Sequence, residues 1–363
     1  MDTTTKPAEQ DERVKIASAH WGPRFVANGV DLSDFTATLA RISVWADWCH
    51  EWGQTAQHYE RLAQDAEEGG RSLTAAEAWR RAALCWHFGK FVFMEDPDLA
   101  RHAQERLVAC YQKGMWALEP AATRFEIPYE DIQMAALLRT PVGVERPPVV
   151  VMLPGLDSVK EELQTTADYF LRRGMATLAV DGPGQGETEA LRNIEPAYER
   201  PVMAVMDWIK QQDTIDTGRV GVFGVSLGGY YAVRSAAFVP GVRAAVDLAG
   251  IYAMAPNWDM RPPMTRATFT KRSGAKTEAE GRERAKAMTL EGATQHVRCP
   301  LLIVHGTRDT IVPFADGERI HAEIPSSELA AFVESNHGCT DRVFESRSMM
   351  ADWLAAQLGG HSE

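Results

Sequence analysis

One serine of the chain stands in a setting that could make it a nucleophile. Residues 219–229 read RVGVFGVSLGG, which places Ser226 at the centre of a G-x-S-x-G pentapeptide between an apolar segment and a predicted helix. This pattern is typical of a nucleophile elbow, a sharp strand-to-helix turn in which a Cβ at either glycine would collide with the neighbouring strand and helix. The alternative is an ordinary glycine-rich turn.

A serine hydroxyl needs a general base, and the base needs a carboxylate to orient it. On a sheet of this kind the chain order is serine, acid, histidine. Asp309 follows an apolar predicted strand at 300–305, and His337 lies in the loop ESNHGC after a predicted strand at 329–333. We therefore expect Ser226 to be the nucleophile, His337 the base and Asp309 the orienting acid.

Each partner has another interpretation. Asp309 could be a solvated turn acid that caps a helix near residue 314, and His337 is one of ten histidines. His305 is the main rival as the base, but it precedes the acid in the chain, which is the wrong order for this topology.

An oxyanion formed at the substrate carbonyl needs two backbone N–H donors. The residue after the nucleophile, Leu227, would supply one at the start of a helix, where the free amides and the helix dipole favour negative charge. The loop PGLDS (154–158), after the apolar strand 148–153, would supply the other through Leu156 or an adjacent residue. The alternative for this loop is a tight turn that requires Gly155.

The segment DGPGQGE (181–187) invites a dinucleotide-binding interpretation. Its glycines are spaced G-x-G-x-G rather than G-x-G-x-x-G, Pro183 lacks an N–H, and no second binding half follows. We expect a structural loop that borders the site. The sequence predicts neither a cofactor nor a metal site.

The second half of the chain has the pattern of an α/β protein. Strands alternate with helices, which predicts a mostly parallel sheet covered by helices on both faces. The segment 250–297 is too long for a connection, so we expect it to be helical and to cover something. The predicted strands are 124–128, 132–139, 148–153, 175–180, 219–223, 242–248, 300–305 and 329–333. The predicted helices are 161–173, 195–212, one starting at 227, one near 314, and a last one ending near 358.

The first half has a helical period from residue 33 to residue 118. Tryptophans at 45, 48 and 52 would share one helix face, and Gly69-Gly70 would end that helix. Thr74 with Glu77 resembles a capping box for the next helix, and Asp96-Pro97 resembles an N-cap with proline at the first helical position.

Composition limits the classes of function. The 363 residues carry a net charge of −12, so a nucleic-acid or membrane-surface role lacks the basic patch that it needs. No apolar run is long enough for a membrane span, and the N-terminus lacks a signal sequence. Five scattered cysteines form no disulfide framework, which favours the cytoplasm.

The phrases PGLDSVKEE, DGPGQGET and GVSLGG resemble those of a group of α/β-hydrolases. This group contains the FrsA-like esterases, fungal polyketide-shortening hydrolases and 2,6-dihydroxypseudooxynicotine hydrolase. The resemblance implies the α/β-hydrolase fold, with residues 1–122 as a helical cap segment, 123–363 as the core, and 250–297 inserted after the strand that follows the nucleophile helix and contributing to the cap. It also implies a cofactor-free homodimer acting on a small molecule.

Several members of this group cleave a carbon–carbon bond next to a ketone. The nicotine-pathway member is thought to use an additional glutamate from the inserted segment. Here residues 255–263 read APNWDMRPP, where Asp259 is the only carboxylate. We therefore add Asp157, Trp258 and Asp259 as candidate pocket residues and expect a different substrate.

Three functions remain open on the sequence. The first is a serine hydrolase that cleaves a carbon–carbon bond of a partly aromatic ketone through an acyl-enzyme. The second is a carboxylesterase with the same triad, and the third is a non-catalytic binding protein that uses the fold as a scaffold.

Overall fold

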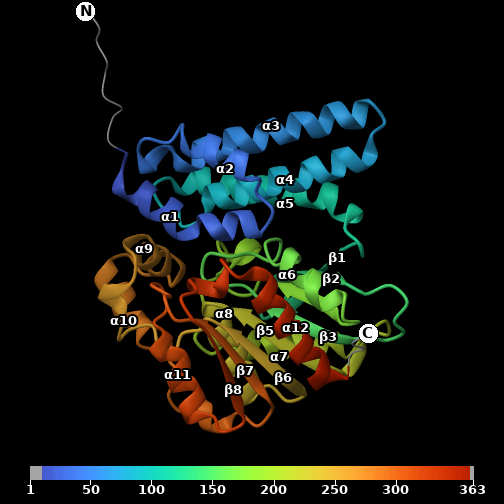
Figure 1. Ribbon diagram of the computed structural model, residues 1–363, viewed down its shortest axis with the longest axis vertical. Helices are drawn as coiled ribbons and strands as arrows, with labels where there is room; N and C mark the ends of the chain where they lie inside the picture. Colours follow the sequence, from blue (N-terminus) through green and yellow to red (C-terminus); the bar gives the residue numbers. More distant parts are fainter. Residues whose placement is uncertain (1–9, 360–363) are drawn as a thin grey trace, which may run out of the picture. The chain divides into compact units, whose positions relative to one another are not determined.

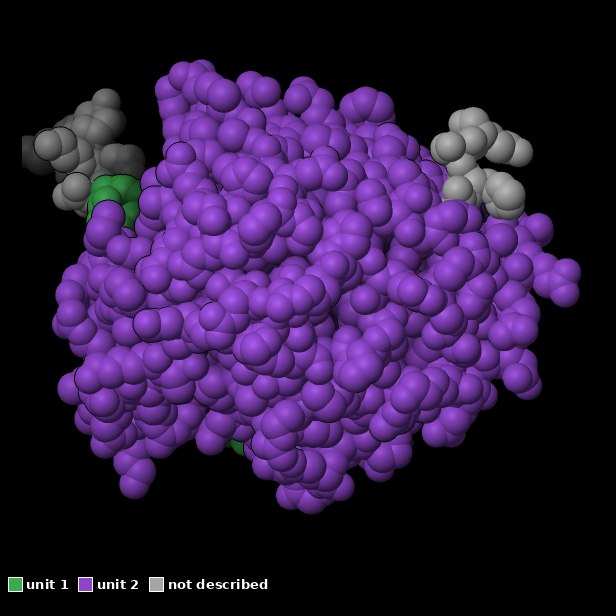
Figure 2. Space-filling view, turned by 90° about the horizontal axis from the view of Figure 1, so that it is seen from below, with its two compact units in different colours: residues 1–115 green, residues 116–363 purple. Residues whose placement is uncertain are grey.

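The computed structural model describes residues 10–359 of the chain. By internal contacts the chain divides into two compact units, residues 1–115 and 116–363, which are drawn in Figure 1 and coloured separately in Figure 2. Among the described residues, no helix combines the length and the apolar character that a membrane span requires.

The first unit consists of helices packed around aromatic side chains. Phe25 and Phe88 stack with their ring centroids 3.7 Å apart, and the Trp48 Nε1 donates a hydrogen bond to the Phe88 carbonyl (2.9 Å). Such rings bury large apolar areas, and this burial holds the helices together. The helices are α1 (Glu12–Ala27), α2 (Leu32–Leu39), α3 (Trp48–Glu68), α4 (Ser72–Lys90) and α5 (Pro97–Gly114).

The helix ends in this unit test the predicted caps. Helix α3 ends before Gly69-Gly70, and the Asp96 side chain accepts hydrogen bonds from two amides at the start of α5, as predicted. The predicted capping box at Thr74 is wrong, because α4 already begins at Ser72 and Thr74 lies inside its first turn. Trp45 precedes α3 in a short 3₁₀ turn, so the three tryptophans are all buried but do not share one helix. The helical prediction also missed α1, which precedes residue 33.

The second unit is built on one eight-stranded sheet. Its spatial order is β1-β2-β4-β3-β5-β6-β7-β8. Strand β2 runs antiparallel to both of its neighbours, β1 and β4, and all the other neighbouring strands are parallel. All eight predicted strands are present, with ends that differ by a few residues. They are β1 (Thr123–Tyr129), β2 (Ile132–Arg139), β3 (Pro148–Leu153), β4 (Ala176–Val180), β5 (Asp216–Val225), β6 (Val242–Leu248), β7 (Leu301–Gly306) and β8 (Ser327–Phe332).

Helices cover the sheet on both faces (Figure 1). One face carries α6 and α12, whose apolar side chains form a buried cluster with those of β3 to β7. Helices α7 and α8 pack against each other over the other face. The helices of this unit are α6 (Gln164–Leu171), α7 (Glu199–Ile209), α8 (Leu227–Phe238), α9 (Pro263–Arg272), α10 (Glu278–Ala285), α11 (Phe314–Glu323) and α12 (Val343–Leu358).

The inserted segment after β6 is helical, as predicted. It contains α9 and α10 together with two short 3₁₀ turns. Because the strands β3 to β8 are parallel, the loops that follow them meet at one edge of the sheet, and this edge is where ligands bind in open α/β sheets. The loops after β3, β5, β7 and β8 contain Leu156, Ser226, Asp309 and His337.

Candidate active site

Ser226 occupies the turn between β5 and α8. Its backbone has φ 58° and ψ −121°, a conformation that residues other than glycine rarely adopt. The Ser226 amide donates to the Leu248 carbonyl at the end of β6 (2.8 Å), which fixes the turn against the neighbouring strand. Strained residues of this kind persist only where the surrounding structure holds them, and they gather at functional sites.

The two glycines of the pentapeptide make this turn possible. A Cβ at Gly224 would lie 1.8 Å from the Gly228 carbonyl oxygen, and a Cβ at Gly228 would lie 2.1 Å from the Leu153 carbonyl oxygen of β3. Both distances are far inside van der Waals contact, so neither position accepts a side chain. The predicted collisions with helix and strand are therefore confirmed.

The loops after β7 and β8 bring an acid and a histidine together. His337 Nδ1 donates to Asp309 Oδ2 at 2.6 Å, while Asp309 Oδ1 accepts from the amides of Ile311 and Val312 at 2.8 and 2.9 Å. Burial alone would raise the pKa of Asp309, but His337 and His305 hold it well below its usual range. An ionised Asp309 can only accept, so it fixes the His337 tautomer with Nε2 free to take a proton.

His305, the rival base, lies on the other side of the acid. Its ring is fully buried, and Nε2 donates to the Val312 carbonyl (3.0 Å) while lying 3.3 Å from Asp309 Oδ2. Burial would lower the pKa of His305, but the hydrogen bond and charge of Asp309 raise it overall. His305 thus contacts Asp309 and helps to keep it ionised, but it does not line the pocket that contains Ser226.

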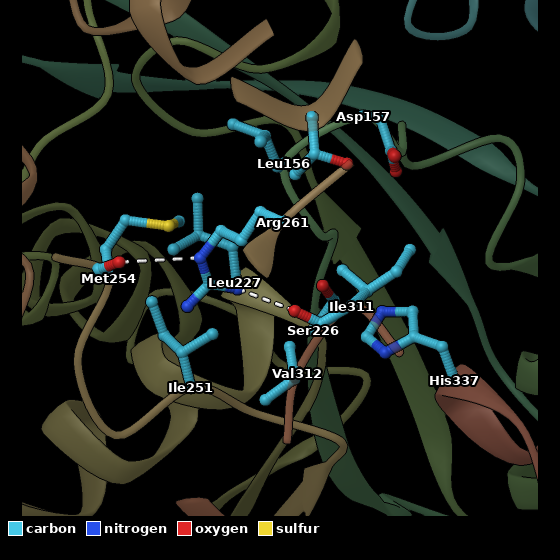
Figure 3. A pocket seen from close by; sticks show the side chains of 11 residues that line it. Leu156, Asp157, Ser226, Leu227, Ile251, Met254, Arg261, Ile311, Val312 and His337 are labelled. Carbon is cyan, nitrogen blue, oxygen red and sulfur yellow. Dashed lines mark hydrogen bonds between the residues drawn. The ribbon is translucent and has the colours of Figure 1, made fainter. Parts of the chain in front are cut away.

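Ser226, His337 and the two predicted oxyanion residues line one pocket (Figure 3). Neither the Leu156 amide nor the Leu227 amide donates a hydrogen bond to an acceptor among residues 10–359. Gly155 brings the first of them close, since its Cβ would lie 3.2 Å from the Ser226 Cβ. The rest of the lining is mostly apolar: Ile251, Met254, Ile311 and Val312. Two unpaired donors beside a serine in apolar surroundings can stabilise a developing oxyanion.

The three candidate pocket residues have different places. Asp157 lines the pocket and is the single acidic side chain to do so among the described residues. Trp258 is buried instead against Phe269, and its Nε1 donates to Glu278 (3.3 Å). Asp259 forms a surface ion pair with Arg282 (2.7 Å). The structure therefore leaves Trp258 and Asp259 outside the pocket, because their short 3₁₀ turn directs them into the inserted segment and towards solvent.

The loop DGPGQGET (181–188) fixes the shape of the loop 154–158, which contains the predicted oxyanion donor Leu156. The buried Gln185 donates from Nε2 to the carbonyls of Pro154 (2.6 Å) and Gly155 (2.8 Å), and its Oε1 accepts from the Tyr198 hydroxyl (2.6 Å). With the carbonyls of 154 and 155 held in this way, the next amide is directed into the pocket. The prediction of a structural loop beside the site is confirmed.

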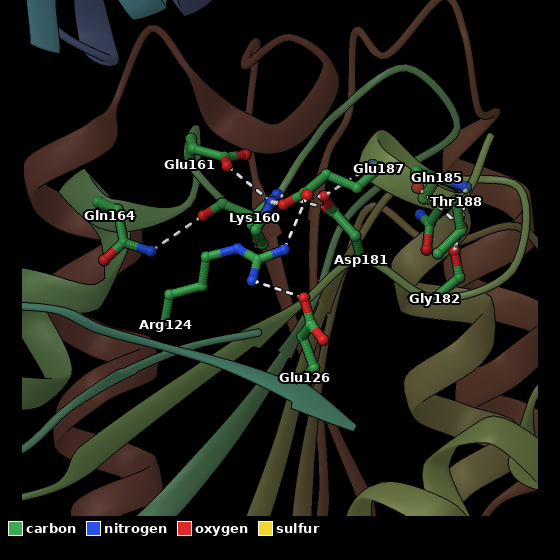
Figure 4. A network of polar contacts seen from close by, with 10 residues as sticks. All are labelled: Arg124, Glu126, Lys160, Glu161, Gln164, Asp181, Gly182, Gln185, Glu187 and Thr188. Atoms are coloured by element: carbon green, nitrogen blue, oxygen red, sulfur yellow. Dashed lines mark hydrogen bonds and ion pairs between the residues drawn. The ribbon is translucent and has the colours of Figure 1, made fainter. Parts of the chain in front are cut away.

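A buried lysine joins the same two loops (Figure 4). Lys160 Nζ lies 2.7 Å from Glu161, 2.9 Å from Asp181 and 2.7 Å from Glu187. Burial would lower the pKa of Lys160, but these three carboxylates raise it. The segment PGLDSVKEE is thus joined by ion pairs to the segment DGPGQGET.

Asp247 of β6 is a buried acid that the sequence analysis missed. Its Oδ1 accepts from the Gly250 amide (2.7 Å), and its Oδ2 has no hydrogen-bond partner among the described residues. Burial raises the pKa of Asp247 to about 7, although the nearby His305 lowers it. A carboxyl kept neutral here makes the folded state bind a proton that the unfolded state releases.

Stability should therefore fall as pH rises, and Asp247→Asn should remove much of this dependence. A folded pKa above the unfolded value gives stability that is present at low pH and lost as pH rises through the folded pKa. For a shift from 3.8 to about 7 the loss between pH 5 and pH 8 is about 2–3 kcal/mol. Urea unfolding at both pH values measures it.

The expected result for Asp247→Asn is a smaller drop in unfolding free energy between pH 5 and pH 8 than in the unaltered protein. The surface variant Asp207→Asn is the control and should reproduce the original slope, because Asp207 pairs with Lys210 in solvent. Identical slopes for all three proteins would contradict a neutral Asp247.

The sheet order, the strained serine after β5 and the acid–histidine pair after β7 and β8 define an α/β-hydrolase. A serine, an acid and a histidine at these strand ends argue against the scaffold interpretation. The chain belongs to one family of that class: residues 40–266 match the family described as "Esterase FrsA-like".

Comparison with individual proteins agrees with this assignment. The chain is 33% identical to 2,6-dihydropseudooxynicotine hydrolase of Paenarthrobacter nicotinovorans, over 98% of this chain and 94% of that one. The crystal structure of 2,6-dihydroxy-pseudo-oxynicotine hydrolase superposes with a TM-score of 0.85 at 32% identity, over 93% of this chain and 95% of that chain. A hydrolase of Aspergillus aculeatus, acrC, is 34% identical to this chain, and the match covers 62% of this chain and 59% of the fungal protein.

Proposed function

We propose that this enzyme is a serine hydrolase that cleaves a carbon–carbon bond next to a ketone through an acyl-enzyme. The observation that carries the proposal is the hydrogen bond from His337 Nδ1 to Asp309 Oδ2 (2.6 Å), with Ser226 and His337 lining one pocket. The family resemblance supports ketone cleavage, and the mostly apolar lining suits a partly aromatic substrate.

The first half-reaction forms the acyl-enzyme. His337 Nε2 takes the Ser226 proton as the oxygen bonds to the substrate carbonyl, and the oxyanion rests on the Leu156 and Leu227 amides. When the tetrahedral intermediate collapses, the carbon–carbon bond breaks and its electron pair leaves with the departing carbon. The proton on His337 passes to that fragment, which must be an enolate or an electron-rich ring to leave at all.

The second half-reaction is hydrolysis. His337 takes a proton from water, the hydroxide adds to the acyl carbon, and the Ser226 oxygen leaves with that proton. A carboxylic acid is released and the serine is regenerated. No external oxidant, reductant or cofactor enters this balance. Asp309 stays ionised throughout and stabilises the imidazolium.

The alternative is an esterase with the same residues, which the family description favours. Two substrates with one acyl group separate the two functions: dibenzoylmethane, which would release benzoate and acetophenone, and p-nitrophenyl benzoate. We expect turnover of both. With hydroxylamine as a competing nucleophile, both should give the same ratio of benzohydroxamate to benzoate, because both pass through one benzoyl-enzyme.

Rapid turnover of the ester without release of acetophenone would support the esterase function and contradict carbon–carbon bond cleavage. Different hydroxamate ratios from the two substrates would contradict a shared acyl-enzyme. The homodimer, the cytoplasmic location and the covering role of residues 1–122 and 250–297 stay predictions.

A further inference from the structure

Arg261 places a positive charge in the wall of the candidate active site. The residue belongs to the inserted segment, is 3% exposed, and lines the same pocket as Ser226 and His337. Figure 3 shows its guanidinium among the apolar side chains of the pocket, apart from the carboxylate of Asp157. The mechanism proposed above gives the Arg261 charge no role.

The partners of this guanidinium are backbone carbonyls. It donates to the carbonyl oxygens of Ile311 (2.8 Å), Ala253 (3.3 Å) and Met254 (3.4 Å). No carboxylate oxygen among residues 10–359 lies within 4.0 Å of it. A guanidinium has five N–H donors, so the three carbonyls leave two of them for a ligand.

Two other buried arginines of this unit have a carboxylate partner. Arg139 pairs with Asp168 and Arg272 pairs with Glu189, each at 2.7 Å. Burial lowers the pKa of Arg261, although the more distant Asp316 and Asp309 oppose this. Both acids are already engaged, Asp316 with the Tyr252 amide and Asp309 with His337. A buried charge without a counter-ion is costly, and it is retained where a ligand completes the pair.

We propose that Arg261 binds an anionic oxygen of the substrate, so that the natural substrate is a ketone that also carries a carboxylate or an ionised phenol or enol. This inference rests on the proposed function, since it names the substrate class of the same pocket. An arginine side chain suits this task because its planar N–H groups bond both carboxylate and phenolate oxygens strongly.

The test measures binding without turnover, in the Ser226→Ala protein. Calorimetry compares two pairs of ligands at pH 8.5, each pair differing in charge. One pair is 4-oxo-4-phenylbutanoate and its neutral amide, and the other is 2,4,6-trihydroxyacetophenone and its trimethoxy analogue. The anionic member of at least one pair should bind about tenfold more tightly or better. Which pair shows the preference distinguishes a carboxylate from an ionised phenol or enol.

Arg261→Gln in the same background should reduce this preference to about twofold or less. Arg261→Lys keeps the positive charge but loses the planar N–H groups of the guanidinium, so it should retain part of the preference for the anionic ligands. This variant also tests the proposal if Arg261→Gln does not fold. Arg282→Gln is the matched control, because Arg282 lies on the same segment but pairs with Asp259 in solvent. It should bind all four ligands like its parent.

Equal dissociation constants for both members of both pairs in the Ser226→Ala protein would overturn the proposal, whatever the arginine variants do. A preference that survives unchanged in folded Arg261→Gln would also overturn it. These outcomes are separate from a failure of the serine mechanism, which would appear as absent turnover in the unaltered enzyme while the anion preference in binding persisted.

Discussion

Replacing Ser226 with alanine is expected to lower kcat/KM for p-nitrophenyl benzoate by a factor of about a thousand to a million. The range follows from other serine hydrolases, in which the loss of the nucleophile leaves only binding and oxyanion stabilisation. The variant should fold as the parent does, because the backbone strain at φ 58° is the same for alanine as for serine. Steady-state kinetics and a thermal melt measure both quantities.

A fluorophosphonate probe gives a second measurement, because it bonds only to an activated serine oxygen. The unaltered enzyme should gain one adduct at Ser226, visible in the intact mass, and the alanine variant should gain none. Ser235→Ala is the matched control: this serine lies on the same helix α8 but is buried, with its hydroxyl bonded to the Tyr231 carbonyl (2.7 Å). It should label like the parent. If the folded Ser226→Ala protein were labelled at the parental rate, Ser226 would not be the nucleophile.

The sequence predicts this site well because its residues follow strand ends. An apolar run marks a buried parallel strand, and parallel strands place the loops at their carboxyl ends on one edge of the sheet. Asp309 and His337 are 28 residues apart in the chain, yet this rule alone predicts that their side chains lie near each other, and the structure places them 2.6 Å apart. The glycines beside Ser226 add local backbone geometry to the same argument.

The pocket wall is less predictable, because it depends on where a long inserted segment directs its side chains. Asp259 and Arg261 are two residues apart, yet Asp259 points to solvent and Arg261 into the pocket. No periodicity marks that difference in a short 3₁₀ turn. A buried arginine also has no sequence signature until its carbonyl partners at 253, 254 and 311 are known. Gln185 was missed for the same reason, since its role depends on carbonyls 30 residues away.

Lys160 joins the loop 154–162 to the loop 181–188 through buried ion pairs. Lys160 is completely buried beside Asp181, Glu161 and Glu187. Among residues 10–359, Glu187 is the one acid of the three that pairs with a second cation, Arg124 (2.9 Å). Burial raises the pKa of Glu161 to about 7, even though Lys160 lowers it. Removing the cation would leave two acids, Asp181 and Glu161, in the interior without the charge that balances them.

Lys160→Met should therefore lower the free energy of unfolding by about 3–5 kcal/mol at pH 8, the usual cost of breaking a buried ion pair from one side. The loss should be smaller at pH 5.5. Glu161 has a folded pKa above its unfolded one, and the substitution removes the Lys160 charge that lowers this pKa, so protonation of Glu161 stabilises the fold at low pH and this stability is lost as pH rises. Urea unfolding at both pH values measures the difference.

The control is Lys210→Met, since Lys210 is an exposed lysine paired with Asp207 on the surface, and its unfolding curves should match those of the parent at both pH values. A deficit for Lys160→Met of equal size at pH 5.5 and pH 8 would point to lost packing rather than to unbalanced charge.

The same variant should also lose hydrolase activity below its melting temperature. Lys160 and Gln185 hold opposite ends of the loop that carries the Leu156 amide, so a loop freed at one end positions that oxyanion donor less well.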